Sequence, residues 1–477
     1  MRKAPSGLAA VVWCTALAGC TARVGPTPSP AADARAGAFV DSLQARTFAF
    51  FWETTNPRNG LAPDRWPNPP FASIAAIGFA LTAYPIGAER RWVSRADAAT
   101  RTLTTLQFLW QLPQDTAATG FAGDRGFFYH FLDMETGLRY RNTELSTIDT
   151  ALLLAGALVA QQYFDGPDGR ETSIRAYADS LYRRVDWTYF LRDLRPLITM
   201  AWRPERGFGP HAYRGYDEAM ILYVLALGSP THPIEPAAWQ AFTSTYEWAE
   251  FHGFAHLNFP PLFGHQYSHV FVDFRGIQDA YMRGRGIDYF ENSRRATLSQ
   301  RQYAIANPGR WTDYGADIWG LTASDGPTDT TIVIGGIARR FHTYWARGAA
   351  APYINDDGTI APTAAGGSIP FAPGVTMRAL VAMRERYGED LYARYGFLDA
   401  FNPTLQDTTV RLRRGRTVQG KGWFDDNYLG IDQGPIVAMI ENHRTGLIWE
   451  LMKKNSYIVR GLCRAGFTGG WIDGRCN

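Results

Sequence analysis

Carboxylate side chains stand at the start of two strongly apolar segments of this chain. Glu144 precedes and Asp149 lies within STIDTALLLAGALVAQQY, and Asp217 and Glu218 directly precede AMILYVLALG. Cleavage of a glycosidic bond needs two carboxyl groups, one protonated as an acid and one ionised as a base or nucleophile. Acids gathered at the ends of buried helices would suit that chemistry.

Helix capping is the competing explanation for each of these acids. Asp and Glu near a helix N-terminus accept hydrogen bonds from free N–H groups and match the helix dipole. Ser146 and Asp149 fit an S-x-x-D capping box, which leaves Glu144 outside the helix and free of that role. Asp217 can cap in the same way and leave Glu218 available. A general acid needs a raised pKa, whereas a helix N-terminus lowers it, so burial or a neighbouring carboxylate must compensate.

The elements that would position these acids are helices of two kinds. Nearly uncharged segments, which predict helices buried on all sides, span 71–87, 148–164, 216–228, 330–341, 373–384 and 434–443. Amphipathic segments between them, including 38–55, 94–111, 171–187, 237–251 and 289–305, predict helices with one wet face. The alternation predicts an all-α fold, an (α/α)6 toroid with an inner and an outer ring. Short strand-like pieces, GFFYHFLD and SHVFVDF, predict β-hairpins in rim loops.

In such a toroid the inner helices run parallel, so their N-termini open on one rim. Asp325 precedes the fourth predicted inner helix and Asp432 precedes the sixth. Aromatic and polar loops fit the same rim, because aromatic rings contact the apolar faces of sugars and polar side chains bond their hydroxyls. Core packing remains the alternative for each Trp. The predicted substrate-binding residues are Tyr129, His130, Asp217, His265, Gln266, Arg275, Trp319, Asp325, Trp423 and Asp432.

No metal or cofactor site is predicted. His265 and His269 have H-x-x-x-H spacing but lack the Glu of a zinc-protease motif, and the strand predicted there would separate them by about 13 Å. The chain has no P-loop and no G-x-S-x-G elbow.

The N-terminus has the pattern of an export signal. Arg2 and Lys3 precede a short apolar stretch that ends on LAGC, which resembles a bacterial lipobox with Cys20 as the lipidated residue. An ordinary cleavable signal is the alternative. We expect a lipoprotein signal peptide at 1–20, a flexible Pro-rich tether at 21–36 and one catalytic domain at 37–477. The expected location is a bacterial cell envelope, on the periplasmic face or at the outer membrane, with the lipid anchor as the only membrane contact.

The composition of the chain limits the classes of molecule that it is expected to bind. The net charge of +3, with 19% charged residues, provides no strong field for nucleic acid. We expect an oligo- or polysaccharide partner, a β-glucan, and a monomeric protein. Cys463 and Cys476 remain in the mature body, and an exported chain predicts a disulfide between them.

Several long motifs resemble one known family. IWGLTASDGP, TELSTIDTALLLAGAL, YDEAMILYVLALGSPTHP and GIDQGPIVAMIENHRTGLIW are similar to the glycoamylase-like domain of glycoside hydrolase family 144, the bacterial endo-β-1,2-glucanases. The resemblance implies an (α/α)6 barrel and inverting hydrolysis of linear or cyclic β-1,2-glucan without a cofactor. It also implies Glu218 as general acid, Glu144 as the group that activates water, and Asp149 in support.

Other functions remain open at this point. A related domain performs transglycosylation on the same fold, which would give longer or cyclic products. A non-catalytic glycan-binding lipoprotein would bind without releasing reducing ends. A lyase would give unsaturated products that absorb ultraviolet light.

Overall fold

The protein is represented by a computed structural model that describes residues 30–68, 71–191 and 196–476. The predicted signal peptide, its lipidation site Cys20 and residues 21–29 of the predicted tether lie outside the described residues. The first helix, α1 (Pro30–Thr54), begins at Pro30, so its first turns overlap the end of that tether.

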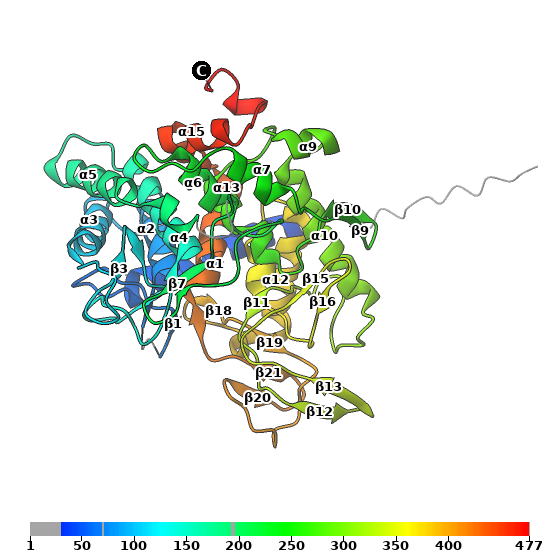
Figure 1. The fold of residues 1–477 in the computed structure, drawn as a ribbon. Coiled ribbons are helices and arrows are strands. Elements are labelled where there is room, and N and C mark those ends of the chain that lie inside the picture. The colour runs from blue at the N-terminus through cyan, green and yellow to red at the C-terminus, as the bar shows by residue number, and fades with distance from the viewer. Residues whose placement is uncertain (1–29, 69–70, 192–195, 477) are drawn as a thin grey trace, which may run out of the picture.

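Six buried helices of the described residues pack in a ring. They are α2 (Ile74–Glu89), α4 (Thr147–Tyr163), α6 (Met220–Gly228), α8 (Tyr267–Phe271), α11 (Pro362–Gly366) and α13 (Gly430–Arg444). Four of them, α2, α4, α6 and α13, can be found at the centre of the helical body in Figure 1. α2 packs between α13 and α4, α4 reaches α6, α6 reaches α8, and α8 and α11 both pack on α13. All nine residues of α6 are buried, as its unbroken apolar sequence predicts.

Two glycines allow the closest contact in this ring, between α2 and α4. A Cβ atom at Gly78 would lie 2.3 Å from the carbonyl oxygen of Leu152, and one at Gly156 would lie 1.9 Å from the carbonyl oxygen of Gly78. Side chains at either position would force the two backbones apart.

Amphipathic helices cover the ring from outside. They are α1, α3 (Arg95–Gln111), α5 (Gly169–Arg183), α7 (Ala237–Thr243), α9 (Ala280–Arg285), α10 (Tyr289–Ala306), α12 (Pro373–Tyr387) and, near the C-terminus, α14 (Leu447–Lys454) and α15 (Ser456–Arg464). α3 packs on α2, α5 on α4, α15 on α6, α12 on α11, and α1 on α13. The predicted (α/α)6 toroid is confirmed.

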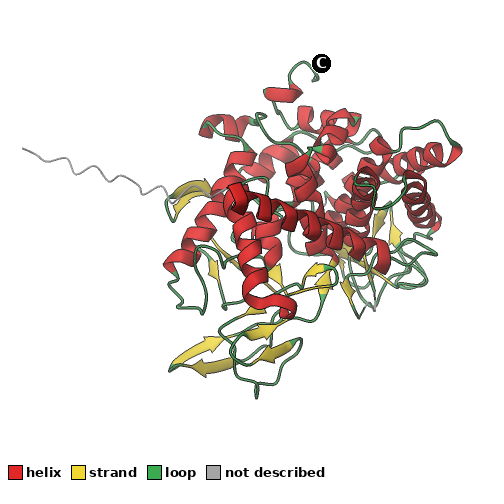
Figure 2. Cartoon of the chain, turned by 180° about the vertical axis from the view of Figure 1, so that it is seen from behind, coloured by secondary structure: helices red, strands yellow, loops and turns green. Residues whose placement is uncertain are grey.

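The strands are short and antiparallel, and most of them gather on one side of the helical body (Figure 2). The two-stranded pairs are β1 (Arg65–Trp66) with β22 (Tyr428–Leu429), β2 (Ala72–Ser73) with β5 (Phe131–Leu132), β3 (Gly123–Asp124) with β4 (Phe127–Phe128), β9 (Trp248–Phe251) with β10 (Phe254–Leu257), β11 (Ala323–Ser324) with β14 (Trp345–Ala346), β12 (Thr331–Ile334) with β13 (Ile337–Arg340), β15 (Gly348–Ala349) with β16 (Ile354–Asn355), and β17 (Tyr392–Ala393) with β18 (Gly396–Phe397). Two three-stranded sheets join β6 (Leu145–Ser146), β7 (Ala201–Arg203) and β8 (Gly207–Phe208), and β19 (Phe401–Asn402), β21 (Gly422–Phe424) and β20 (Arg416–Val418).

The fourth predicted inner helix, 330–341, is wrong. The segment forms the β12–β13 hairpin, which projects from the strand-rich side (Figure 1). Gly335 and Gly336 have φ of 56° and 77° and form its two-residue turn. Ile332 and Ile334 pack on a small apolar cluster, whereas Val333 between them is 69% exposed. The apolar residues therefore alternate with period two, as in a strand.

Two further predictions need correction. The segment SHVFVDF is not a strand, because residues 267–271 form α8, whose five buried residues show no amphipathic period. The segment 373–384 is helical but lies in the outer ring, since only one face of α12 is buried. The short helix α11 occupies the inner position. The predicted helix over 237–251 ends at Thr243, and β9 follows it.

The C-terminal cysteines form the predicted disulfide, with the two sulfur atoms of Cys463 and Cys476 2.02 Å apart. Within residues 30–68, 71–191 and 196–476, no helix combines the length and apolar character that crossing a lipid bilayer requires.

Candidate active site

A cavity of about 340 Å³ opens where the inner helices begin. Residues before or within the first turns of α4, α6, α8 and α13 contribute to its wall. Its lining comprises His130, Glu144, Ser146, Ile148, Asp149, Leu152, Met200, Ala201, Tyr213, Glu218, Phe263, Tyr267, Ala323, Tyr344 and Ile431. Glu144, Asp149 and Glu218, the three predicted catalytic acids, therefore face one cavity.

Local structure sets the position of the first two acids. Glu144 directly precedes β6, and Ser146 at the end of β6 is the N-cap of α4. The Ser146 hydroxyl accepts a hydrogen bond from the backbone N–H of Asp149, at 3.2 Å, and also bonds the Asp149 carboxylate. The predicted N-cap at Ser146 is confirmed, and it fixes Asp149 in the first turn while Glu144 stays outside the helix. The Asp149 carboxylate bonds the Ser146 hydroxyl in place of the backbone N–H that closes a full capping box.

Glu144 is held by two cationic neighbours. Its Oε1 lies 3.0 Å from Nδ1 of His130, and its Oε2 accepts a 2.6 Å hydrogen bond from Arg203. β7 pairs with β6, and this antiparallel register places Arg203 next to Glu144. Burial opposes ionisation of Glu144, but the hydrogen bond and charge of His130 outweigh it, with help from Arg203, and lower its pKa to about 2.

His130 lies between β4 and β5 and contacts both acids at the start of α4. Its Nε2 is 3.5 Å from Oδ2 of Asp149, and its backbone N–H donates to the carbonyl oxygen of Glu144 at 2.8 Å. Burial alone would lower the pKa of His130, but the charge of Asp149 and the hydrogen bond with Glu144 raise it to about 9. His130 is therefore an imidazolium at neutral pH.

Glu218 experiences the opposite environment. It precedes α6, is partly buried and lines the cavity, and its carbonyl oxygen accepts a 2.8 Å hydrogen bond from Ser268. Burial raises the pKa of Glu218 to about 7, and the Asp149 carboxylate adds to this rise. Asp217 takes the capping role beside it, because its Oδ1 accepts the backbone N–H of Ala219 at 2.8 Å. Burial therefore raises the pKa of Glu218 even though a position at a helix N-terminus would lower it.

The cavity therefore holds one carboxyl group that stays protonated to near neutrality and one that is ionised across the usual pH range. Two carboxyl groups whose pKa values are separated in this way can divide the roles of acid and base. Such a pair can protonate a leaving oxygen and accept a proton from an attacking water.

Of the ten predicted substrate-binding residues, the structure brings His130 to the cavity wall, and Asp217 lies behind Glu218. Tyr129 and Trp319 are fully buried in the core, where an aromatic ring serves packing. His265 is fully buried, with Nε2 3.2 Å from the carbonyl oxygen of Phe259, and burial lowers its pKa well below 6.5. Gln266 links α8 to α11 by donating to the carbonyl oxygen of Ala364 and the hydroxyl of Ser368.

The remaining four predicted residues also lie outside the cavity lining. Arg275 pairs with Asp273 at 2.7 Å and stacks over Trp449 of α14. Trp423 is fully buried in the small cluster under the β12–β13 hairpin. Asp325 and Asp432 are buried and do not line the cavity, although each lies within two residues of a lining residue, Ala323 and Ile431 respectively.

Several cavity residues were not among the sequence predictions. Tyr213 and Tyr344 come from loops, Phe263 from the short 3-10 helix Leu262–His265, and Tyr267 from the five-residue helix α8. Arg203 of β7 does not line the cavity but bonds Glu144, which does. The pairing of β6 with β7 would have indicated Arg203, but two-residue strands leave no clear pattern in a sequence.

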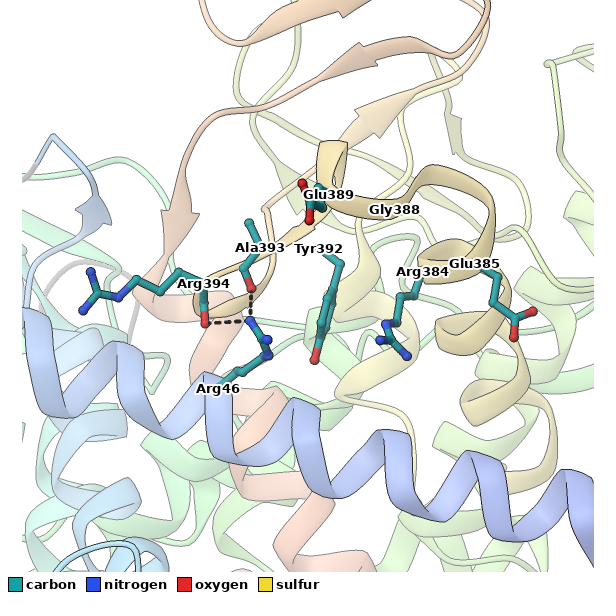
Figure 3. Close-up of a pocket in the computed structure, with 8 residues that line it drawn as sticks. All are labelled: Arg46, Arg384, Glu385, Gly388, Glu389, Tyr392, Ala393 and Arg394. Atoms are coloured by element: carbon teal, nitrogen blue, oxygen red, sulfur yellow. Dashed lines mark hydrogen bonds between the residues drawn. The ribbon is translucent and has the colours of Figure 1, made fainter.

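A second hollow of about 700 Å³ lies between α1 and α12 (Figure 3). Arg46 donates there to the carbonyl oxygens of Ala393 and Arg394, at 2.7 and 3.3 Å. Its two acids, Glu385 and Glu389, are exposed and point away from each other (Figure 3). It lacks the enclosed pair of acids that the first cavity has.

Several known proteins are similar to this chain in sequence and fold. An exo β-1,2-glucooligosaccharide sophorohydrolase (non-reducing end) of Parabacteroides distasonis is 28% identical over 458 residues, which cover 89% of this chain. The chain spans 57% of that protein's length. The structure of the Chitinophaga pinensis endo-β-1,2-glucanase, in complex with sophorotriose and glucose, superposes with a TM-score of 0.77 at 27% identity, over 91% of this chain and 99% of that chain.

A Bacteroides uniformis protein described as a candidate glucoamylase has a structure with a TM-score of 0.77 and 32% identity, over 91% of this chain and 98% of that chain. The Glycoamylase family model matches residues 210–456, more than half of the chain, including Glu218. The chain therefore belongs to the Glycoamylase family.

Proposed function

We propose that this protein is a glycoside hydrolase that cleaves β-1,2-glucan by inversion, with Glu218 as general acid. One observation carries the proposal: Glu144 and Glu218 face the same cavity, and their pKa values are about 2 and about 7, respectively. The substrate class follows the two relatives whose names specify β-1,2-linked glucose.

In the proposed step, Glu218 donates its proton to the glycosidic oxygen as the bond from that oxygen to the anomeric carbon breaks. A water molecule attacks the anomeric carbon from the opposite face, and its proton passes to an ionised carboxylate. Glu144 is assigned this role, with Asp149 at the start of α4 in support. Both oxygens of Glu144 already bond cations, which keeps it charged but also makes it a weak base.

His130 and Arg203 are positioning residues in this scheme. They hold the Glu144 carboxylate at the cavity wall in its ionised form. Tyr267, Tyr213 and Phe263 supply ring surfaces in the same wall, and such surfaces suit the apolar faces of a sugar.

The protein is also proposed to act in a bacterial cell envelope as a monomeric lipoprotein. The lipobox-like sequence ending at Cys20 and the Pro-rich segment 21–36 support an anchor followed by a tether. The C-terminal disulfide is consistent with an oxidising compartment.

Product analysis tests the proposed reaction. Purified protein would be incubated with β-1,2-, β-1,3- and α-1,4-glucans, and the products separated by chromatography and their new anomers assigned by NMR. The expected result is shorter β-1,2-linked products with an inverted anomer. Longer or cyclic products would indicate transglycosylation instead, and an absence of new reducing ends with every glucan would contradict a hydrolase.

A further inference from the structure

Three buried aspartates meet behind the wall of the catalytic cavity. Asp325 follows β11, Asp399 precedes β19 and Asp425 follows β21, so they come from three separate loops. One carboxylate oxygen from each lies within 4.8 Å of one from each of the others. The exposed fractions of the three residues are 1%, 2% and 0%.

Each of these carboxylates has one oxygen in use and one without a partner. Asp325 Oδ2 pairs with Arg65 at 2.6 Å, Asp399 Oδ2 accepts the backbone N–H of Asp325 at 2.6 Å, and Asp425 Oδ1 accepts the backbone N–H of Asp426 at 2.8 Å. The second oxygens, Asp325 Oδ1, Asp399 Oδ1 and Asp425 Oδ2, have no hydrogen-bond donor among the described residues, and the carboxyl groups of Asp399 and Asp432 lie within hydrogen-bond reach of each other. A buried oxygen without a partner is costly, so three in one place require an explanation.

Two further side chains near the three aspartates, Asn427 and Asp432, also have a buried oxygen without a hydrogen-bond partner. Asn427, which is 2% exposed and donates to Asp425 and Asp426, has an unpartnered Oδ1. Asp432, which is 4% exposed, has an unpartnered Oδ2. An amide oxygen cannot be relieved by taking up a proton in the way a carboxylate can, so Asn427 points independently to a missing positive ligand.

The nearby cationic side chains pair with only one of the three aspartates, Asp325. Asp325 has Arg65 and, at 3.4 Å, Arg414. Arg65 is shared with Asp64. Among the ion pairs of the described residues, none involves Asp399 or Asp425. Buried carboxylates are normally paired or coordinate a metal.

We propose that Asp325, Asp399 and Asp425 bind one calcium ion, with Asn427 and Asp432 as further oxygen donors. Calcium takes six to eight oxygen ligands at about 2.3–2.6 Å, so opposite ligands lie about 5 Å apart, which suits the spacing of the three aspartates. Magnesium usually keeps several waters and is bound through one or two carboxylates, whereas a buried site with several protein oxygens is more typical of calcium.

A sugar is a poorer occupant of the same place. None of these five residues lines the cavity, whose wall is formed here by Ala323, Tyr344 and Ile431. An ion needs only the enclosed space between the oxygens, whereas a sugar ring would have to displace the wall. The ion would tie the β19–β21 sheet to the start of α13, and so brace the wall at Ala323 and Ile431 from behind.

Calcium uptake by the full chain tests this site independently of glucan cleavage. Protein treated with a chelator and then freed of it would be titrated with calcium chloride or magnesium chloride, with bound metal measured by mass spectrometry and Tm by calorimetry. The expected result is one calcium per chain and a rise in Tm of at least ~2 °C at saturation.

Asp425→Asn keeps the size of the side chain but removes a charged ligand, and it should abolish both uptake and the calcium-dependent rise in Tm. Asp390→Asn, at an acid paired with Arg416 and Lys421 outside the cluster, is the matched control and should retain both. Comparing each variant with and without calcium keeps the test valid if Asp425→Asn is itself destabilised. No uptake by the wild type, uptake of magnesium only, or undiminished calcium uptake by Asp425→Asn would each overturn the proposal.

Discussion

Nδ1 of His130 lies 3.0 Å from Oε1 of Glu144, and this contact helps to separate the pKa values of the two glutamates proposed to be catalytic. The imidazolium, together with Arg203, stabilises the charged form of Glu144. No ion pair of the described residues involves Glu218, and burial raises its pKa to about 7. The four predictions below follow from this asymmetry and from the packing of the ring that supports it.

Glu218→Gln should reduce kcat on β-1,2-glucan by about 10²- to 10⁴-fold, because the amide cannot donate the proton that the leaving oxygen needs. Tm should change little, since Gln preserves the shape of the side chain. Glu389→Gln in the second hollow is the control and should retain full activity. Wild-type kcat in Glu218→Gln would remove Glu218 from the mechanism.

Replacing Glu144 or Asp149 distinguishes the base from the supporting acid. If Glu144 accepts the proton from water, Glu144→Gln should lower kcat by about 10²- to 10⁴-fold, and Asp149→Asn should have a clearly smaller effect. Steady-state kinetics on β-1,2-glucan, with Tm as the folding control, makes the comparison. A larger loss in Asp149→Asn would exchange the two roles.

The pH profile should show its main limb on the alkaline side. Glu218 is protonated below its pKa of about 7, so kcat/KM should fall about tenfold per pH unit above that value. Glu144, with a pKa of about 2, is ionised throughout the accessible range and should give no acid limb near neutrality. The Asp149 charge contributes to the raised pKa of Glu218, so Asp149→Asn should move the alkaline limb to lower pH in residual activity. A limb that stays in place or moves upward would contradict this coupling.

Gly156→Ala should destabilise the protein by about 1–3 kcal/mol, because the new Cβ meets the backbone of α2 at Gly78. Chemical denaturation monitored by circular dichroism measures the loss. Gly169→Ala is the matched control: this glycine is exposed at the first position of α5, and nothing lies within 4 Å of an added Cβ. Equal stability of the two variants would show that the ring tolerates separation of α2 from α4.

The ring could be predicted from sequence where its helices are long. The apolar runs of α2, α4 and α6, the Ser146 cap and the amphipathic α3, α5 and α10 all carry signals within a few turns of chain. The short inner helices α8 and α11 carry none, because five buried residues show neither a period nor a wet face. The hairpin at 331–340 also resembles a buried helix in sequence, because β12 has apolar β-branched residues on both of its faces.

The sequence by itself determined which carboxylates stand at the starts of the inner helices, since caps and apolar runs are local patterns. Only the tertiary structure decided which of them share a cavity and which proton state each holds. Glu144 is charged because His130, between β4 and β5, and Arg203 of β7 reach it, and the pKa of Glu218 is raised because burial opposes its ionisation. Asp325, Asp399 and Asp425 likewise meet only after folding. Electrostatic energy depends on the distance between charges in space, and the number of residues between two segments does not determine that distance.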